Sequence, residues 1–100
     1  MFVKTAGEGV ELACTTGSAE IAIPNDYAGK RARYLMIAND SLTLAIHFRV
    51  GQTGGTSVTT DTVVPLNGVP IYVCVIGNTH IQAIMGSGTA NLSMSAVEPR

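Results

Sequence analysis

The residues Thr43-Leu44-Ala45-Ile46-His47-Phe48-Arg49-Val50 alternate between apolar and mixed side chains along their whole length. The apolar set is Leu44, Ile46, Phe48 and Val50, and the mixed set is Thr43, Ala45, His47 and Arg49. A period of two residues is typical of a β-strand with one buried face. The segment Asn91–Ala96 repeats the pattern, with Leu92, Met94 and Ala96 as its apolar positions. No apolar stripe with a period of 3.6 residues persists for eleven residues, so we predict an all-β chain.

About eight short strands fit between the glycine, asparagine, aspartate and proline residues that punctuate the sequence. We expect them at Phe2–Thr5, Ala19–Ile23, Arg33–Asn39, Leu42–Val50, Ser57–Thr60, Thr62–Leu66, Val69–Ile76 with Thr79–Met85, and Ala90–Val97. Strands of about 5–6 residues joined by loops of about 4–6 fill a chain of 100 residues and leave no room for a helix. The sequence therefore predicts one compact antiparallel β-sandwich, either a jelly roll or a simpler sandwich, over residues 18–100. Residues 1–17 are its N-terminal arm or its first strand.

Two tight turns organise the last third of the chain. Asn67-Gly68 is the strongest two-residue signal for a type I′ hairpin, and it lies between two apolar segments. Gly77-Asn78 joins Ile71–Ile76 to Thr79–Met85 and suits a type II′ or type I′ turn. A third turn, Gly86-Ser87-Gly88, precedes the last strand. We therefore expect a meander of three or four antiparallel strands in this part of the chain.

Charged side chains are scarce and unevenly placed. They make up 13% of the chain, against about 25% in a typical protein, and Asp61 is the only one between Val50 and Val97. A hydrophobic content of 46% excludes intrinsic disorder. Because the surface of a monomer usually carries about 25–35% charged residues, we expect the C-terminal half to pack against other chains.

The segment Ile71–Ile76 is apolar on both faces. Ile71, Val73 and Val75 share one face, and Tyr72, Cys74 and Ile76 share the other. Antiparallel sheets normally leave one face in water. Either this is a central strand covered by a second layer of its own chain, or its outer face meets a neighbouring subunit. We expect a homo-oligomer, a dimer or a trimer.

No constellation of residues predicts catalysis or metal binding. The two histidines and two cysteines have no metal-ligand spacing: they are Cys14, His47, Cys74 and His80. We interpret Cys74 as a buried thiol made inert by a raised pKa. Reduced thiols are favoured over a Cys14–Cys74 disulfide, because no export signal follows Met1. We expect no enzymatic activity and no cofactor.

The acidic and glycine-rich segments also have structural interpretations. Asp26, Asp40 and Asp61 lie at predicted turns, where aspartate is a common choice. The segment Gly51–Ser57 superficially resembles a phosphate-binding loop, but it lacks the lysine of that motif and no helix follows. We interpret it as a mobile hairpin or crossover loop.

Lys30-Arg31-Ala32-Arg33, followed by Tyr34, is the one conspicuous cluster of charge. Such cations keep a strand edge soluble, contact phosphates, or meet an acidic patch on a protein partner. A net charge of -1 argues against nucleic acid as the main partner. No membrane partner is expected either, since the longest apolar run, Val69–Ile76, is far shorter than the ~20 residues of a membrane helix.

The order of elements from Thr43 to Val97 resembles small virion proteins of tailed bacteriophages. The resemblance rests on a strand ending in Phe48-Arg49-Val50-Gly51, a Thr/Gly-rich loop, Asp61–Leu66 with Asn67-Gly68, Thr79–Ile84, and a Gly-Ser-Gly turn before the closing strand. Within that group, capsid decoration or cement proteins are β-sandwiches that sit on the outer shell as trimers or dimers. The resemblance implies that the chain binds the major capsid protein, stabilises the head, and is made in the host cytoplasm before joining the virion surface.

We take this virion role as the leading hypothesis. The expected partner-binding residues are Lys30, Arg31, Arg33, Phe2, Tyr72 and Ile76. The three cations should lie outside the apolar centre of the subunit interface. The alternatives are a tail or head–tail connector component of a phage and a ligand- or carbohydrate-binding β-sandwich.

Overall fold

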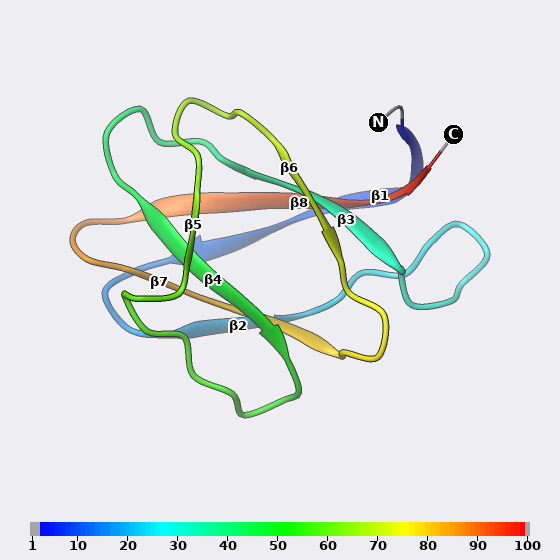
Figure 1. The fold of residues 1–100 in the computed structure, drawn as a ribbon, viewed down its shortest axis with the longest axis horizontal. Coiled ribbons are helices and arrows are strands. Elements are labelled where there is room, and N and C mark those ends of the chain that lie inside the picture. The colour runs from blue at the N-terminus through cyan, green and yellow to red at the C-terminus, as the bar shows by residue number, and fades with distance from the viewer. Residues whose placement is uncertain (1–2, 100) are drawn as a thin grey trace.

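The chain folds as a sandwich of two antiparallel sheets. The computed structural model describes residues 3–99, and Figure 1 shows the fold. The strands are β1 (Val3–Cys14), β2 (Ala19–Ala22), β3 (Tyr34–Asn39), β4 (Ile46–Gly51), β5 (Thr62–Val64), β6 (Ile71–Cys74), β7 (His80–Met85) and β8 (Ala90–Pro99). The predicted all-β sandwich of about eight strands is confirmed.

The strand order is that of a jelly roll. Sheet A has the order β1-β8-β3-β6, and sheet B has the order β2-β7-β4-β5. Every connection except the one from β4 to β5 crosses from one sheet to the other. Strands that are distant in sequence are therefore neighbours in each sheet, as Greek-key connections require.

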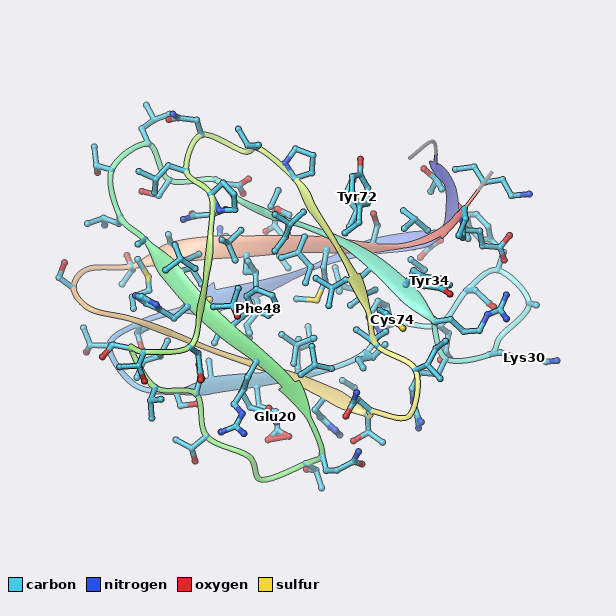
Figure 2. All side chains as sticks on the ribbon, in the orientation of Figure 1. Glu20, Lys30, Tyr34, Phe48, Tyr72 and Cys74 are labelled. Atoms are coloured by element: carbon cyan, nitrogen blue, oxygen red, sulfur yellow. The ribbon has the colours of Figure 1, made fainter. Side chains whose placement is uncertain are left out.

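The core lies between the two sheets and follows the predicted alternation. In β4, Ile46 and Phe48 are buried, and Figure 2 shows Phe48 directed into the interior. In β8, Leu92, Met94 and Ala96 are buried, with exposed fractions of 2% or less. Their neighbours on the other face of each strand are exposed or half-buried, except Val97, which is buried.

The predicted meander is wrong. Asn67, Gly68 and Gly77 have positive φ values of 64°, 71° and 85°, so both turns form. However, β6 lies in sheet A while β5 and β7 lie in sheet B, so neither turn closes a hairpin. The N–H of Gly68 instead donates to the carbonyl of Asn39 at 2.8 Å. The residues of each turn reverse the direction of the chain as predicted. Packing across the core, and not the turn, determines which strand pairs with which.

The segment between β4 and β5 contains no strand at Ser57–Thr60, which the alternation had suggested. The Asp61 carboxylate accepts hydrogen bonds from the Val58 N–H at 3.0 Å and the Ser57 hydroxyl at 2.9 Å. The Asp61 N–H donates back to the Val58 carbonyl at 2.9 Å. These contacts close a tight turn, which competes with extended structure.

The first part of the chain is a strand of the sandwich and not a separate arm. β1 pairs with β8 from Val3 to Cys14, and the register shifts between Thr5 and Gly9. The bulge interrupts the alternation of side chains, because the adjacent residues Ala6 and Gly7 are both buried there, and the adjacent Glu8 and Gly9 are both exposed. This interruption explains why residues 5–17 lack a clear pattern.

Candidate functional site

The cations of the sequence cluster lie on the loop that joins β2 to β3. Asp26 organises this loop. Its carboxylate accepts hydrogen bonds from the N–H groups of Ala28 and Lys30, at 2.9 and 3.0 Å. The Asp26 N–H also donates to the Lys30 carbonyl at 2.7 Å, and Gly29 supplies the positive φ that the turn requires. The loop is thus a closed hairpin with a defined shape.

The loop presents its side chains to solvent. Lys30, Arg31 and Arg33 are exposed, whereas Ala32 is only 4% exposed and anchors the loop in the core. Lys30 projects away from the sandwich (Figure 2). Among residues 3–99, none of the three cations has a carboxylate within ion-pairing distance. Their charges are available to a partner molecule.

Tyr27 completes this surface, which we call the cationic loop (Tyr27, Lys30, Arg31 and Arg33). The Tyr27 side chain is 71% exposed, although its N–H is fixed by the Ala6 carbonyl at 2.7 Å. A depression of about 440 Å³ on the loop is lined by Asp26, Ala28, Lys30, Arg31 and Arg33, whereas Tyr27 lines a second depression beside β1. Tyr27 is not among the residues predicted from the sequence to bind a partner, and its position beside the turn-forming Asp26 is the signal that points to it.

Tyr72 lies on the outer face of sheet A, and Ile76 lies in the turn that follows β6. β6 is the last strand of that sheet, and the side chains of Tyr72 and Ile76 are 45% and 56% exposed. Within residues 3–99 no second layer covers them, so β6 is not the central strand that one alternative proposed. Figure 2 shows Tyr72 pointing away from the sandwich.

The structure brings the two groups of predicted residues next to each other. The N–H of Val75, immediately after β6, donates to the carbonyl of Arg33 at 2.8 Å. The cationic loop therefore adjoins one end of the β6 edge. Phe2, the remaining predicted partner-binding residue, lies outside the described residues.

The prediction for the cysteines was wrong in one respect. Cys14 is the buried thiol, and Cys74 is exposed on the outer face of sheet A. Both are free thiols. Burial raises the pKa of Cys14 to about 11. Cys74 belongs to an apolar segment, but it lies on an edge strand and faces outward, which the alternation alone does not reveal.

A polar surface that the sequence analysis missed lies on the outer face of sheet B. The loop that follows β4 folds over this face, where both oxygens of the Glu20 carboxylate accept the Gly54 N–H at 3.2 Å. The Gln82 amide donates to the Gln52 carbonyl at 2.8 Å. Gln82 is fully buried, and its Oε1 atom has no partner. The loop interpreted as mobile is thus tied to the sheet by side chains from β2 and β7.

Each of the two histidines contacts residues close to it in sheet B and its loops. His80 lies 3.7 Å from the Glu20 carboxylate, and its Nδ1 atom is 2.8 Å from the Thr79 hydroxyl. His47 Nδ1 lies 3.1 Å from the Asp61 carbonyl. Within residues 3–99, no three His, Cys, Asp or Glu side chains are grouped so that they could hold a metal ion.

Comparisons with known proteins give no relative: no family model, curated protein or solved structure matches the chain. The part of the chain that the structure describes contains no helix that could span a membrane.

Proposed function

We propose that the chain is a structural protein of a tailed-phage virion, a capsid decoration or cement protein that binds the major capsid protein and stabilises the head. The observation that carries the proposal is the cationic loop, where a 71% exposed tyrosine lies close in sequence to three exposed cations that make no ion pair within residues 3–99. This is the chemistry of a protein-binding surface. The proposal assigns no catalytic role to any residue.

The cationic loop is preorganised for binding. Tyrosine and arginine are the residues most often enriched at the energetic centres of protein interfaces. Here the backbone around Tyr27 is already fixed by Asp26 and by the Ala6 carbonyl. Binding therefore orders side chains more than backbone, which lowers its entropic cost.

The charge of the loop favours an acidic protein surface as its partner. Lys30, Arg31 and Arg33 concentrate half of the chain's six basic residues at one end of a molecule whose net charge is -1. Such a small patch on a nearly neutral protein guides the orientation of a protein complex, whereas nucleic-acid binders usually neutralise many phosphates. We therefore place the contact with the capsid at the cationic loop.

Repetition on a shell makes modest contacts sufficient. A capsid presents the same surface many times, so neighbouring copies bound to it are held at high effective concentration. The jelly roll suits this role because its compact sandwich supplies separate surfaces for the capsid and for other copies.

The test uses the virions whose genome encodes the chain. Mass spectrometry and electron microscopy of purified particles should find it on the outer shell, in copy numbers comparable to the major capsid protein. Particles assembled without the chain should release their genome at a lower temperature, and purified protein added back should restore the original temperature. Absence from virions overturns the proposal, and a few copies at the neck or tail assign a connector role instead.

A matched pair of variants tests the cationic loop. Lys30→Gln with Arg31→Gln lowers the charge by two and should weaken binding to particles lacking the chain about tenfold or more. Thr16→Glu with Thr89→Glu makes the same change of charge at exposed positions outside the loop and should leave affinity unchanged. Equal losses in both variants would show that total charge, and not the loop, controls binding.

A further inference from the structure

The sandwich leaves four strand edges, and three of them are protected against pairing with another chain. The edges are β1 and β6 of sheet A and β2 and β5 of sheet B. β1 carries exposed Glu8 and Glu11 and contains the bulge. β2 carries Glu20, and β5 has only three residues. Charges, bulges and short length are the usual means by which proteins block edge pairing.

β6 is as short as β2, with four residues, but it carries no charged side chain and no bulge. The segment Thr62–Val97 contains no Asp, Glu, Lys or Arg, and β6 lies within it. Among the described residues, no strand pairs with the outer side of β6. An edge of this kind is a template for a further strand.

The direction of the free backbone groups follows from the ladder with β3. The N–H of Val75 donates to the Arg33 carbonyl. Val73 lies opposite Leu35, two positions further along the same ladder. Backbone groups of successive residues in a strand point to opposite sides, so those of Val73 and Val75 face β3. The N–H and C=O groups of Tyr72 and Cys74 therefore point to the free edge.

We propose that β6 pairs antiparallel with the β6 of a second copy, about a two-fold axis beside Val73. In this register, Tyr72 of each copy lies opposite Cys74 of the other, and each pair exchanges both of its backbone hydrogen bonds. Sheet A of one copy and sheet A of the other then form one continuous sheet across the dimer.

A second copy is favoured as the partner because the edge is complementary to itself. A two-fold axis places the same donors and acceptors opposite one another in reverse order, as an isologous interface requires. β6 brings no charge to this contact, whereas two β1 edges would bring glutamates together. The inward-facing Val73, half-buried at the rim of the core, would pack against its own copy.

The flanking residues restrict the pairing to this register. Pro70 precedes β6 and has no N–H to donate, and the chain turns away at Gly77, which has a φ of 85°. Tyr72 and Cys74 are thus the residues that offer edge groups, and an axis beside Val73 pairs them with each other. This inference does not depend on the capsid role and concerns the purified chain alone.

The first measurement is the mass of the full chain in solution. Sedimentation equilibrium should give a reversible dimer with twice the 10.4 kDa mass of the monomer. Tyr72→Lys should raise the dimer dissociation constant at least about tenfold, since it adds a charge beside the axis. Val58→Lys, at a position of similar exposure outside sheet A, should leave it unchanged. A monomer at all concentrations, a trimer, or equal effects of both substitutions would overturn the proposal.

A second variant tests the register by forming a bond. Tyr72→Cys places a thiol opposite Cys74 of the other copy, within the range of Cα separations that disulfides span. Mild oxidation should give a covalent dimer that a reducing agent separates. The unchanged chain should not crosslink through Cys74. In the proposed dimer the two Cys74 residues are offset by two positions along the paired strands, so their Cα atoms lie beyond the roughly 7 Å limit for a disulfide. Crosslinking of the unchanged chain, or none in the variant, contradicts this axis.

Discussion

Asp61 shows how a single charged residue can be structural. The Val58 N–H and the Ser57 hydroxyl, which both donate to its carboxylate, hold the pKa of Asp61 below its ordinary value of 3.8. A carboxyl whose pKa is lowered by folding stabilises the folded state above its ordinary pKa. That stabilisation is lost as the pH falls through the lowered value.

We therefore expect Asp61→Asn to be less stable than the unchanged chain at pH 7. The difference should shrink steadily as the pH falls below about 4, where the unfolded-state carboxyl protonates. Urea unfolding of both proteins at several pH values measures it. A difference in the free energy of unfolding that is the same at pH 7 and pH 3 would contradict the assigned hydrogen bonds.

The two cysteines should differ sharply in reactivity. Since burial raises the pKa of Cys14 to about 11, its thiol stays protonated and covered at pH 8, while Cys74 is exposed. A thiol reagent should modify one cysteine rapidly in the folded protein and both in urea. Cys74→Ser should abolish the rapid reaction, and Cys14→Ser should preserve it. Rapid modification of Cys14 in the folded chain would show that its site opens.

At the scale of the strands, the connection between β2 and β3 packs against the bulge in β1. A Cβ atom on Gly7 would lie 2.6 Å from the Asn25 carbonyl oxygen and 3.0 Å from the Ala96 Cβ. Neither neighbour is a flexible side chain, so neither can move aside easily to make room for the added Cβ atom. Glycine at this position thus allows the base of the cationic loop to approach β1.

Gly7→Ala should accordingly destabilise the fold by about 1–3 kcal/mol, the usual cost of overpacking. Gly9→Ala is the matched control, because its Cβ would meet only the Met94 carbonyl oxygen at 3.7 Å, an ordinary contact. Its free energy of unfolding should stay within about 1 kcal/mol of the original. Urea unfolding compares the two variants, and equal stabilities would mean that the loop moves aside without cost.

Sequence patterns predicted strand existence better than strand partners. The alternation around Ile46 and Leu92 gave the correct buried faces, and Asn67-Gly68 gave a correct local turn. These features depend on neighbouring residues alone. Pairing depends on the whole core, so the expected meander was replaced by crossings between sheets. The contact between Arg33 and Val75 joins segments that only the jelly roll brings together, and no local pattern signals it.

At the scale of the whole molecule, the two ends of the described chain lie together. Val3 pairs with Pro99, and Figure 1 shows the start of β1 beside the end of β8. The exposed turn at residues 86–88 lies at the other end of β8. Short, exposed connections of this kind tolerate new chain ends.

A circular permutant should therefore fold. We expect a chain that joins residue 99 to residue 3 through a short glycine-rich linker, and opens between Ser87 and Gly88, to lose no more than about 1 kcal/mol of stability. Thermal unfolding followed by circular dichroism measures this. Opening the same chain between Gln82 and Ala83, inside the central strand β7, should prevent folding. A stable second permutant would contradict the assigned place of β7 in the sheet.

The pairing of the first strands with the last also sets the order of events during synthesis. β1 cannot pair before β8 has been made, and β2 cannot pair before β7 has been made. Among the described residues, each of them has only that one partner strand. On a ribosome, the nascent chain can form at most the β3–β6 and β4–β5 ladders until β7 (His80–Met85) has been translated, and β1 has no partner strand until β8 follows. Until then, the apolar segments of the other strands remain unpaired and exposed. A cell that produces the protein therefore needs to shield the chain from aggregation until translation ends.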